Sequence, residues 1–218
     1  MSRKQYAAEF IGTFALVFCG TGAIVINDLH QGVIGHLGIA FTFGAIVLAM
    51  IYTFGDISGA HINPAVTLGF WLAGKFKGKS VLPYTLSQAA GALSASLCLR
   101  LLFPAHQNLG MTLPAGPLWQ SFFLEIILSY ILMLVIIHVA SGSKETGTMA
   151  GIAIGSVVML EAAFAGPVSG ASMNPARSLA PALIAGNLEY QWIYLLAPVV
   201  GMALSIVTWK LMNSKRTQ

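Results

Sequence analysis

The chain has 218 residues, of which 56% are hydrophobic and only 8% are charged, with a formal net charge of +4. Soluble domains carry about 25% charged residues, so this composition excludes an ordinary soluble protein and indicates an integral membrane protein. The apolar segments are long and continuous rather than short and alternating, which favours spanning helices over a β-barrel. In this setting the excess of basic residues does not indicate nucleic acid as a partner.

Six apolar segments are long enough to cross a bilayer, which takes about 20 residues in a helix. The sequence predicts spans near residues 6–26, 35–54, 81–103, 118–139, 147–165 and 192–212. The first segment is long enough to remain as a span, so we do not expect it to be a cleaved signal peptide. Both cysteines, Cys19 and Cys98, lie inside predicted spans, and no residue spacing indicates a metal site or a disulfide framework. We therefore expect neither a metal nor a cofactor.

Two further apolar segments, 64–73 and 175–185, are only about half as long as a span requires. Each follows an asparagine and begins with a proline, at Asn63-Pro64 and Asn174-Pro175. Asparagine is a preferred N-cap and proline is favoured at the first helical position, so each pair marks a helix start. Irregular backbone is tolerated inside a membrane only where it packs in protein or lines a wet cavity. The two short segments therefore predict the lumen of a pore.

The Asn-Pro pairs belong to a ten-residue stretch that occurs twice, as SGAHINPAVT at 58–67 and SGASMNPARS at 169–178. A glutamate precedes each copy by a similar distance, at Glu9 and Glu125. The duplication predicts a single transmembrane domain over 1–218 that is built from two inverted repeats, at approximately 6–103 and 118–212.

The basic residues predict which connections share a side of the membrane. Nine of the eleven fall before the first span, before the third, between the fourth and fifth, or at the C-terminal end, namely Arg3, Lys4, Lys75, Lys77, Lys79, Lys144, Lys210, Lys215 and Arg216. With six spans these places lie on one side, which the positive-inside rule makes cytoplasmic, together with both termini. The two half-length helices then enter from opposite sides, so Asn63 and Asn174 meet at mid-membrane. Amides that cap their own helices would present fixed NH₂ donors, backed by the helix dipoles.

Ala65 and Ala176 complete two Asn-Pro-Ala tripeptides, and Arg177 directly follows the second. With Glu9 and Glu125, these residues make the chain resemble the aquaporin (major intrinsic protein) family over essentially its whole length. The second loop is most similar to the nodulin-26-like branch and its bacterial relatives. The resemblance implies an all-α membrane protein with six transmembrane helices, two reentrant half-helices, one pore in each subunit and a homotetramer.

The resemblance also implies a constriction built from four residues, Phe43, Ala162, Ala171 and Arg177. Strict water channels typically have His at the second position, and Ala162 departs from that pattern. Two alanines opposite one phenylalanine imply a wider and less polar opening that admits solutes larger than water. Ser178 and Ala182 instead match the water-selective branch, so the solute stays open. Apart from any resemblance, an intramembrane arginine such as Arg177 is a functional-site hypothesis that would donate hydrogen bonds and repel cations.

Four more residues receive predicted roles. Glu9 and Glu125 have no partner base or metal ligands, and the resemblance implies that they accept hydrogen bonds from the backbone of the two loops. Glu161 stands where the nodulin-like branch usually has Asn; it either lines the pore or packs between helices, and we favour packing. His61 precedes the first Asn-Pro-Ala tripeptide and, by resemblance, lines the inner vestibule.

The sequence thus predicts a passive channel for water and small uncharged solutes in a lipid membrane, with oxygen atoms passing Asn63 and Asn174 in single file. Glycerol and neutral metalloid acids such as arsenite or silicic acid are implied only by the nodulin-like resemblance, and a strictly water-selective channel is the alternative. An ion-coupled secondary transporter also uses inverted repeats and broken helices, with Glu161 as its only candidate coupling site. An intramembrane enzyme is disfavoured because the sequence has no nucleophile-base pair or clustered ligands.

Overall fold

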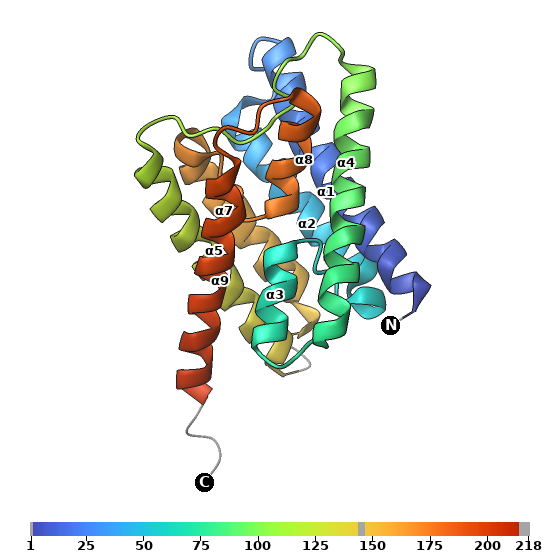
Figure 1. Ribbon diagram of the computed structural model, residues 1–218, viewed down its shortest axis with the longest axis vertical. Coiled ribbons are helices and arrows are strands. Elements are labelled where there is room, and N and C mark those ends of the chain that lie inside the picture. The colour runs from blue at the N-terminus through green and yellow to red at the C-terminus, as the bar shows by residue number, and fades with distance from the viewer. Residues whose placement is uncertain (1, 144–146, 214–218) are drawn as a thin grey trace.

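The computed structural model describes residues 2–143 and 147–213, which form helices and connecting loops without a strand. Six helices have 20 residues or more: α1 (Arg3–Leu29), α2 (Gly35–Ser58), α4 (Val81–Leu102), α5 (Leu118–Ser141), α7 (Ala150–Ser169) and α9 (Gln191–Asn213). The shorter helices that lie wholly within the described residues are α3 (Pro64–Leu72), the 3-10 helix η1 (Gly78–Ser80) and α8 (Pro175–Ala185). The start of α1 and the end of α9 lie at the same end of the bundle (Figure 1).

Each predicted span corresponds to one long helix, although α4 differs from the rest. Helices α1, α2, α5, α7 and α9 are long and apolar enough to cross a membrane. Helix α4 has 22 residues and is less apolar because serine, glutamine and arginine side chains interrupt its sequence. Of the basic residues that are predicted to lie on the cytoplasmic side, Lys144, Lys215 and Arg216 are outside the described residues.

Helices α2 and α7 both continue four residues beyond their predicted ends, to Ser58 and Ser169. Each then stops at a glycine in the left-handed conformation, Gly59 with φ of 87° and Gly170 with φ of 84°. Glycine ends helices in this way because it has no Cβ to clash at positive φ. The Ser-Gly pairs that begin the duplicated stretch are therefore helix ends.

The same packing pattern occurs twice in the bundle. Helix α1 packs on α4 and α2, and α5 packs on α9 and α7, while α2 and α7 pack on each other. Each short helix packs on a long helix of the other half: α3 packs on α9, and α8 packs on α4. Figure 1 shows α3 and α8 in opposite halves of the bundle's length.

Glycines allow the long helices to approach closely where they cross. A Cβ on Gly155 of α7 would lie 2.7 Å from the carbonyl oxygen of Gly44 in α2, and a Cβ on Gly44 would lie 2.5 Å from that of Gly155. The crossings of α1 with α4 and of α5 with α9 are closer still, since a Cβ on Gly91 or Gly201 would lie 2.2 Å from a carbonyl oxygen of the facing helix. Small residues at such crossings let helices associate by van der Waals contact within a membrane.

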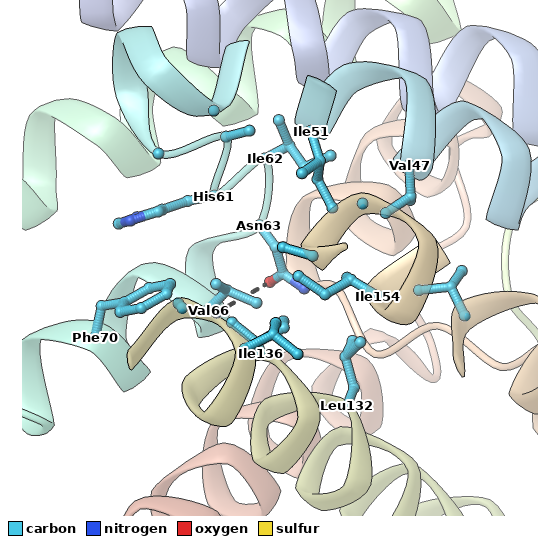
Figure 2. Close-up of a pocket in the computed structure, with 18 of the residues that line it drawn as sticks. Val47, Ile51, His61, Ile62, Asn63, Val66, Phe70, Leu132, Ile136 and Ile154 are labelled. Carbon is cyan, nitrogen blue, oxygen red and sulfur yellow. Dashed lines mark hydrogen bonds between the residues drawn. The ribbon is translucent and has the colours of Figure 1, made fainter. Parts of the chain in front are cut away.

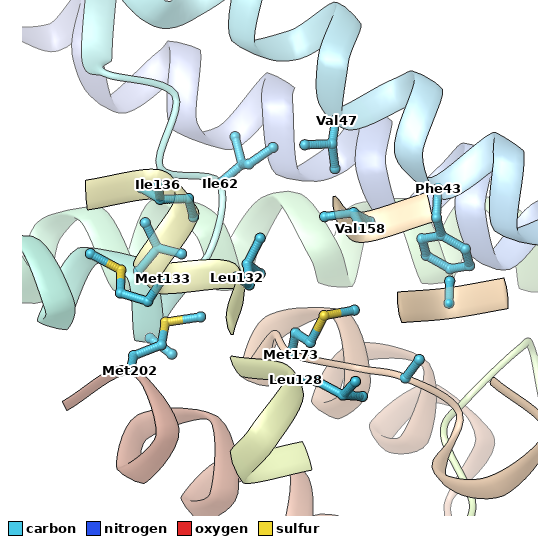
Figure 3. Close-up of a cluster of buried hydrophobic side chains, with 14 of the residues drawn as sticks. Phe43, Val47, Ile62, Leu128, Leu132, Met133, Ile136, Val158, Met173 and Met202 are labelled. Atoms are coloured by element: carbon cyan, nitrogen blue, oxygen red, sulfur yellow. The ribbon is translucent and has the colours of Figure 1, made fainter. Parts of the chain in front are cut away.

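The apolar core surrounds the centre of the bundle and includes side chains from both halves (Figure 3). Several of these buried side chains also line a central cavity, including Val47, Leu132, Ile136 and Val158. The core is therefore also the wall of the site described next.

Candidate functional site

Each short helix begins at its predicted asparagine cap. The side-chain oxygen of Asn63 accepts hydrogen bonds from the backbone N–H groups of Ala65 (2.9 Å) and Val66 (3.5 Å). Asn174 likewise accepts from Ala176 (3.0 Å) and Arg177 (3.3 Å). The prolines, Pro64 and Pro175, occupy the first helical position. Both amides are therefore oriented by their own helices.

The two helix tips touch through the other ends of these amides. Asn63 Nδ2 donates to the carbonyl oxygen of Met173 at 2.8 Å, and Asn174 Nδ2 donates to that of Ile62 at 2.9 Å. An amide NH₂ group has two donors, so one N–H of each joins the loops to each other. Sequence reasoning had not anticipated these cross-bonds. The second N–H of each amide remains available to the cavity that both asparagines line.

That cavity has a volume of about 1010 Å³ and runs beside both asparagines. Its wall is mostly apolar, as Figure 2 shows for Val47, Ile136 and Leu132 around Asn63. The two amides are therefore localised hydrogen-bond donors in a mainly hydrophobic passage.

A second cavity of about 460 Å³ meets the first at Phe43 and Arg177, which line both. Ala162 lines the second cavity and Ala171 lines the first. The Arg177 guanidinium carbon lies 4.9 Å from the centroid of the Phe43 ring. Of the four predicted constriction residues, Phe43 and Arg177 therefore lie between the two cavities, and each alanine lines one of them.

Arg177 is only 3% exposed. Its Nη1 donates to the carbonyl oxygen of Gly110 at 3.0 Å, and its Nε has no hydrogen-bond partner among the described residues. A buried guanidinium with unused donors beside two cavities can bind a passing oxygen atom.

The two predicted carboxylates hold the two loops in matching ways. Glu125, fully buried, accepts from Ser169 Oγ at 2.7 Å, from the N–H of Ser172 at 2.8 Å and from the N–H of Met173 at 2.9 Å. Met173 has a φ of 53°, which is rare for a residue with a side chain. The three donors hold this loop in its unusual conformation.

Glu9 does the same for the first loop. It accepts from Ser58 Oγ at 2.7 Å, from the N–H of His61 at 2.9 Å and from the N–H of Ile62 at 2.7 Å. Ile62 has a φ of 43°. Glu9 has one further donor, Gln88 Nε2 at 2.7 Å, where the second half has Pro198 at the position that aligns with Gln88.

Comparison with known proteins identifies the family. The model of the major intrinsic protein family matches residues 1–209. This chain belongs to the major intrinsic protein family. It is 46% identical over 211 residues to Aquaporin NIP1-4 of Oryza sativa subsp. japonica, covering 96% of this chain and 77% of that protein. It is 45% identical to Nodulin-26 of Glycine max, covering 91% of this chain and 73% of that protein.

A solved structure agrees with this assignment. The X-ray structure of the aquaglyceroporin from Plasmodium falciparum superimposes with a TM-score of 0.87 at 26% identity, covering 97% of each chain. The predicted fold is confirmed: an all-α aquaporin-type membrane protein with six transmembrane helices and two reentrant half-helices. The chain is a multi-pass membrane protein of a family of channels.

In this aquaporin-family chain, His61 lines the larger cavity and is 7% exposed. Its ring stacks on Phe70 with centroids 4.7 Å apart, and Phe76 and Tyr84 pack around it. Its Nδ1 lies 3.2 Å from Thr67 Oγ1. The ring is therefore fixed as part of the cavity wall.

Glu161 lies outside the linings of both cavities. It is 4% exposed, and both of its carboxylate oxygens are without a hydrogen-bond partner among the described residues. No hydrogen bond or ion pair joins it to Arg177 in the described chain. An ionised carboxylate in these surroundings would be costly.

Two positioning contacts escaped sequence reasoning. The carbonyl of Gly110 reaches Arg177 from a loop 67 residues away in the sequence, and a backbone carbonyl carries no residue-specific signal. Gly20 of α1 leaves the space that the Phe43 ring fills, since a Cβ there would overlap the ring. A glycine inside an apolar helix indicates a close approach, but not what approaches it.

Proposed function

We propose that this chain is a passive channel that conducts water and small uncharged solutes, such as glycerol and neutral metalloid acids like arsenite or silicic acid, and excludes ions and protons. The observation that carries the proposal is a pair of helix-capping amides, those of Asn63 and Asn174. Both line one cavity, which Arg177 also lines. The chain supplies its own hydrogen-bond donors along this route and needs no cofactor for passive flow.

The mechanism follows from the direction of these donors. A water oxygen that accepts from both asparagines has its hydrogens turned away from the centre, so a chain of waters cannot relay a proton past this point. The positive ends of two helix dipoles also oppose cations here. Aquaporin-type selectivity is an established example of this electrostatic barrier.

Phe43, Ala162, Ala171 and Arg177 form the selectivity filter in this proposal. Arg177 repels cations and donates to passing oxygens, while the small side chains of Ala162 and Ala171 leave the junction wide. Ser178 and Ala182 match the water-selective branch, which keeps strict water selectivity as the alternative. The likeness to a solved aquaglyceroporin favours the wider solute range.

The remaining site residues have supporting roles. Glu9 and Glu125 keep the two loops rigid, and His61 forms part of the inner vestibule. We assign Glu161 to helix packing as a neutral carboxylic acid, because an unpaired buried charge would be costly.

The assembly is also part of the proposal. The chain is one channel domain over 1–218, made of inverted repeats at approximately 6–103 and 118–212, with both termini cytoplasmic by the positive-inside rule. We propose a homotetramer because this is typical of the family. Large exposed apolar side chains on the long helices, such as Leu37, Phe41 and Leu160, suit contact with lipid or neighbouring subunits.

Light scattering by proteoliposomes under osmotic shock tests the solute range. We expect fast relaxation with water, and entry of glycerol and neutral arsenite that does not saturate. Ala162→His should reduce the flux of the larger solutes by about tenfold or more and preserve water flux, because the imidazole narrows the junction. A small change of size in a pocket discriminates between solutes by about 1–3 kcal/mol, which is tenfold or more.

An unchanged flux of glycerol and arsenite through Ala162→His would contradict the filter assignment. Flux that saturates, moves charge or requires a gradient of H⁺ or Na⁺ would favour an ion-coupled secondary transporter instead.

A further inference from the structure

The position of the Arg177 guanidinium depends on a loop that connects α4 to α5. Among the described residues, the one hydrogen bond that its side chain makes is from Nη1 to the carbonyl oxygen of Gly110, at 3.0 Å. Gly110 belongs to the loop over 103–117, which passes across the same end of the bundle as α8 (Figure 1). A shift of this carbonyl would therefore remove that hydrogen bond and leave the guanidinium only its contact with the Phe43 ring.

The backbone around Gly110 has an unusual conformation that needs support. Leu109 is fully buried with a φ of 49°, and Gly110 follows with a φ of 68°. Gly110 lies directly against α1, since a Cβ there would be 2.9 Å from the carbonyl oxygen of Thr21. Glycine adopts positive φ without cost, but a leucine in this conformation is costly unless neighbouring groups hold it.

His106 adds to the support that the turn receives from the backbone bond between the Met111 N–H and the carbonyl oxygen of Asn108, at 2.9 Å. The backbone N–H of Leu109 donates to His106 Nδ1 at 3.0 Å. Because Nδ1 accepts, the neutral ring must carry its hydrogen on Nε2. His106 Nε2 lies 3.1 Å from Asp28 Oδ2 in the last turn of α1, so it donates to that carboxylate. The imidazole therefore links the loop to α1.

Helix α4 also holds the same residue, through its backbone. Arg100 Nη1 donates to the carbonyl oxygen of His106 at 2.8 Å. His106 is 8% exposed, whereas the Asp28 side chain is 52% exposed. The histidine is thus enclosed between two helices, and its ring is oriented by an aspartate at the surface.

We propose that His106, oriented by Asp28, is a positioning residue for the selectivity filter: it holds the Gly110 carbonyl that fixes Arg177. This inference rests on the proposed function, because it takes Arg177 as part of the selectivity filter. His106 does not line either cavity, so it acts through the loop and not on the solute.

The test compares glycerol and water permeability of proteoliposomes that contain His106→Ala, His106→Asn or the wild-type channel. His106→Ala should raise the glycerol-to-water ratio by about fivefold, the factor that loss of one hydrogen bond implies. His106→Asn should restore the wild-type ratio, because an asparagine side chain can also accept from a backbone N–H a few residues later. Asp28→Ala should raise the ratio less than His106→Ala, and Asp28→Asn should retain the wild-type ratio.

Two controls separate this inference from the proposed function. His30→Ala changes another histidine, exposed at the end of α1, and should leave the ratio unchanged. Arg177→Ala should raise the ratio by itself, and His106→Ala should add nothing in that background.

A raised ratio in Arg177→Ala with a wild-type ratio in His106→Ala would overturn the role of His106 and leave the proposed function intact. Additive effects in the double variant would also overturn it, because His106 would then act elsewhere. No effect of Arg177→Ala would contradict both proposals. If His106→Ala does not reach the membrane, Asp28→Ala removes the same link, and a wild-type ratio there overturns the inference.

Discussion

Two carboxylates buried near the second loop have opposite surroundings. Glu125 receives three hydrogen bonds from the loop that it holds, whereas Glu161 receives none from the described residues. Both are almost completely shielded from solvent. Glu125 is therefore part of the structure of the loop. Glu161 can be replaced by a neutral residue without breaking any hydrogen bond that the structure records.

Replacement of each glutamate by glutamine tests this contrast. Glu161→Gln should preserve water permeability and thermal stability, because an amide replaces a neutral acid of the same shape. Glu125→Gln should lower the free energy of unfolding by roughly 1–3 kcal/mol for each backbone N–H left facing an amide NH₂ group. Osmotic light scattering and thermal melting in detergent measure the two effects. Loss of water flux in a Glu161→Gln channel that melts normally would give Glu161 a direct role in conduction.

Helix packing determines where the filter residues lie. Phe43 of α2 packs against Gly20 of α1, and the centroid of its ring lies 4.9 Å from the Arg177 guanidinium carbon. The width of the junction therefore depends on how closely α1 and α2 approach, as well as on the residues that line it.

Gly20→Ala should narrow the junction. Alanine is favoured over glycine in a helix by about 1 kcal/mol, so α1 itself should tolerate the change. The added methyl group would overlap the Phe43 ring, so the ring must move, and we expect it to move toward Arg177. Since overpacking costs about 1–3 kcal/mol, we expect the glycerol-to-water permeability ratio to fall by roughly fivefold or more. Gly22→Ala in the same helix is the matched control, because a Cβ there would meet only Leu99 Cδ2, at 3.4 Å, and Gly22 lines neither cavity. Equal ratios in both variants would argue against Gly20 as the spacer.

At the scale of the whole molecule, features with a local cause could be predicted from sequence. The second half-helix, Pro175–Ala185, has its predicted bounds, because the Asn-Pro cap and the glycine that follows the helix are local signals. The predicted ends of α2 and α7 are too early. Both helices continue to Ser58 and Ser169, next to the glycines that stop them.

Contacts between distant segments could not be predicted in this way. The bond from Arg177 to Gly110 joins a side chain to a backbone carbonyl, and the cross-bonds of Asn63 and Asn174 also end on carbonyls. Backbone acceptors are the same in every residue, so no residue type marks them. Their positions follow from how the loops fold against the helices, which only the three-dimensional structure reveals.

The central claim is that two opposed half-helices form a passive pore that passes water and blocks protons. The most direct measurement follows liposome volume and internal pH together after an osmotic shock, with the pH dye inside vesicles that contain the purified channel. We predict rapid water flow at all osmotic gradients, with proton entry no faster than in protein-free vesicles. Water flow at the protein-free rate, or proton entry that accompanies the flow, would contradict the claim.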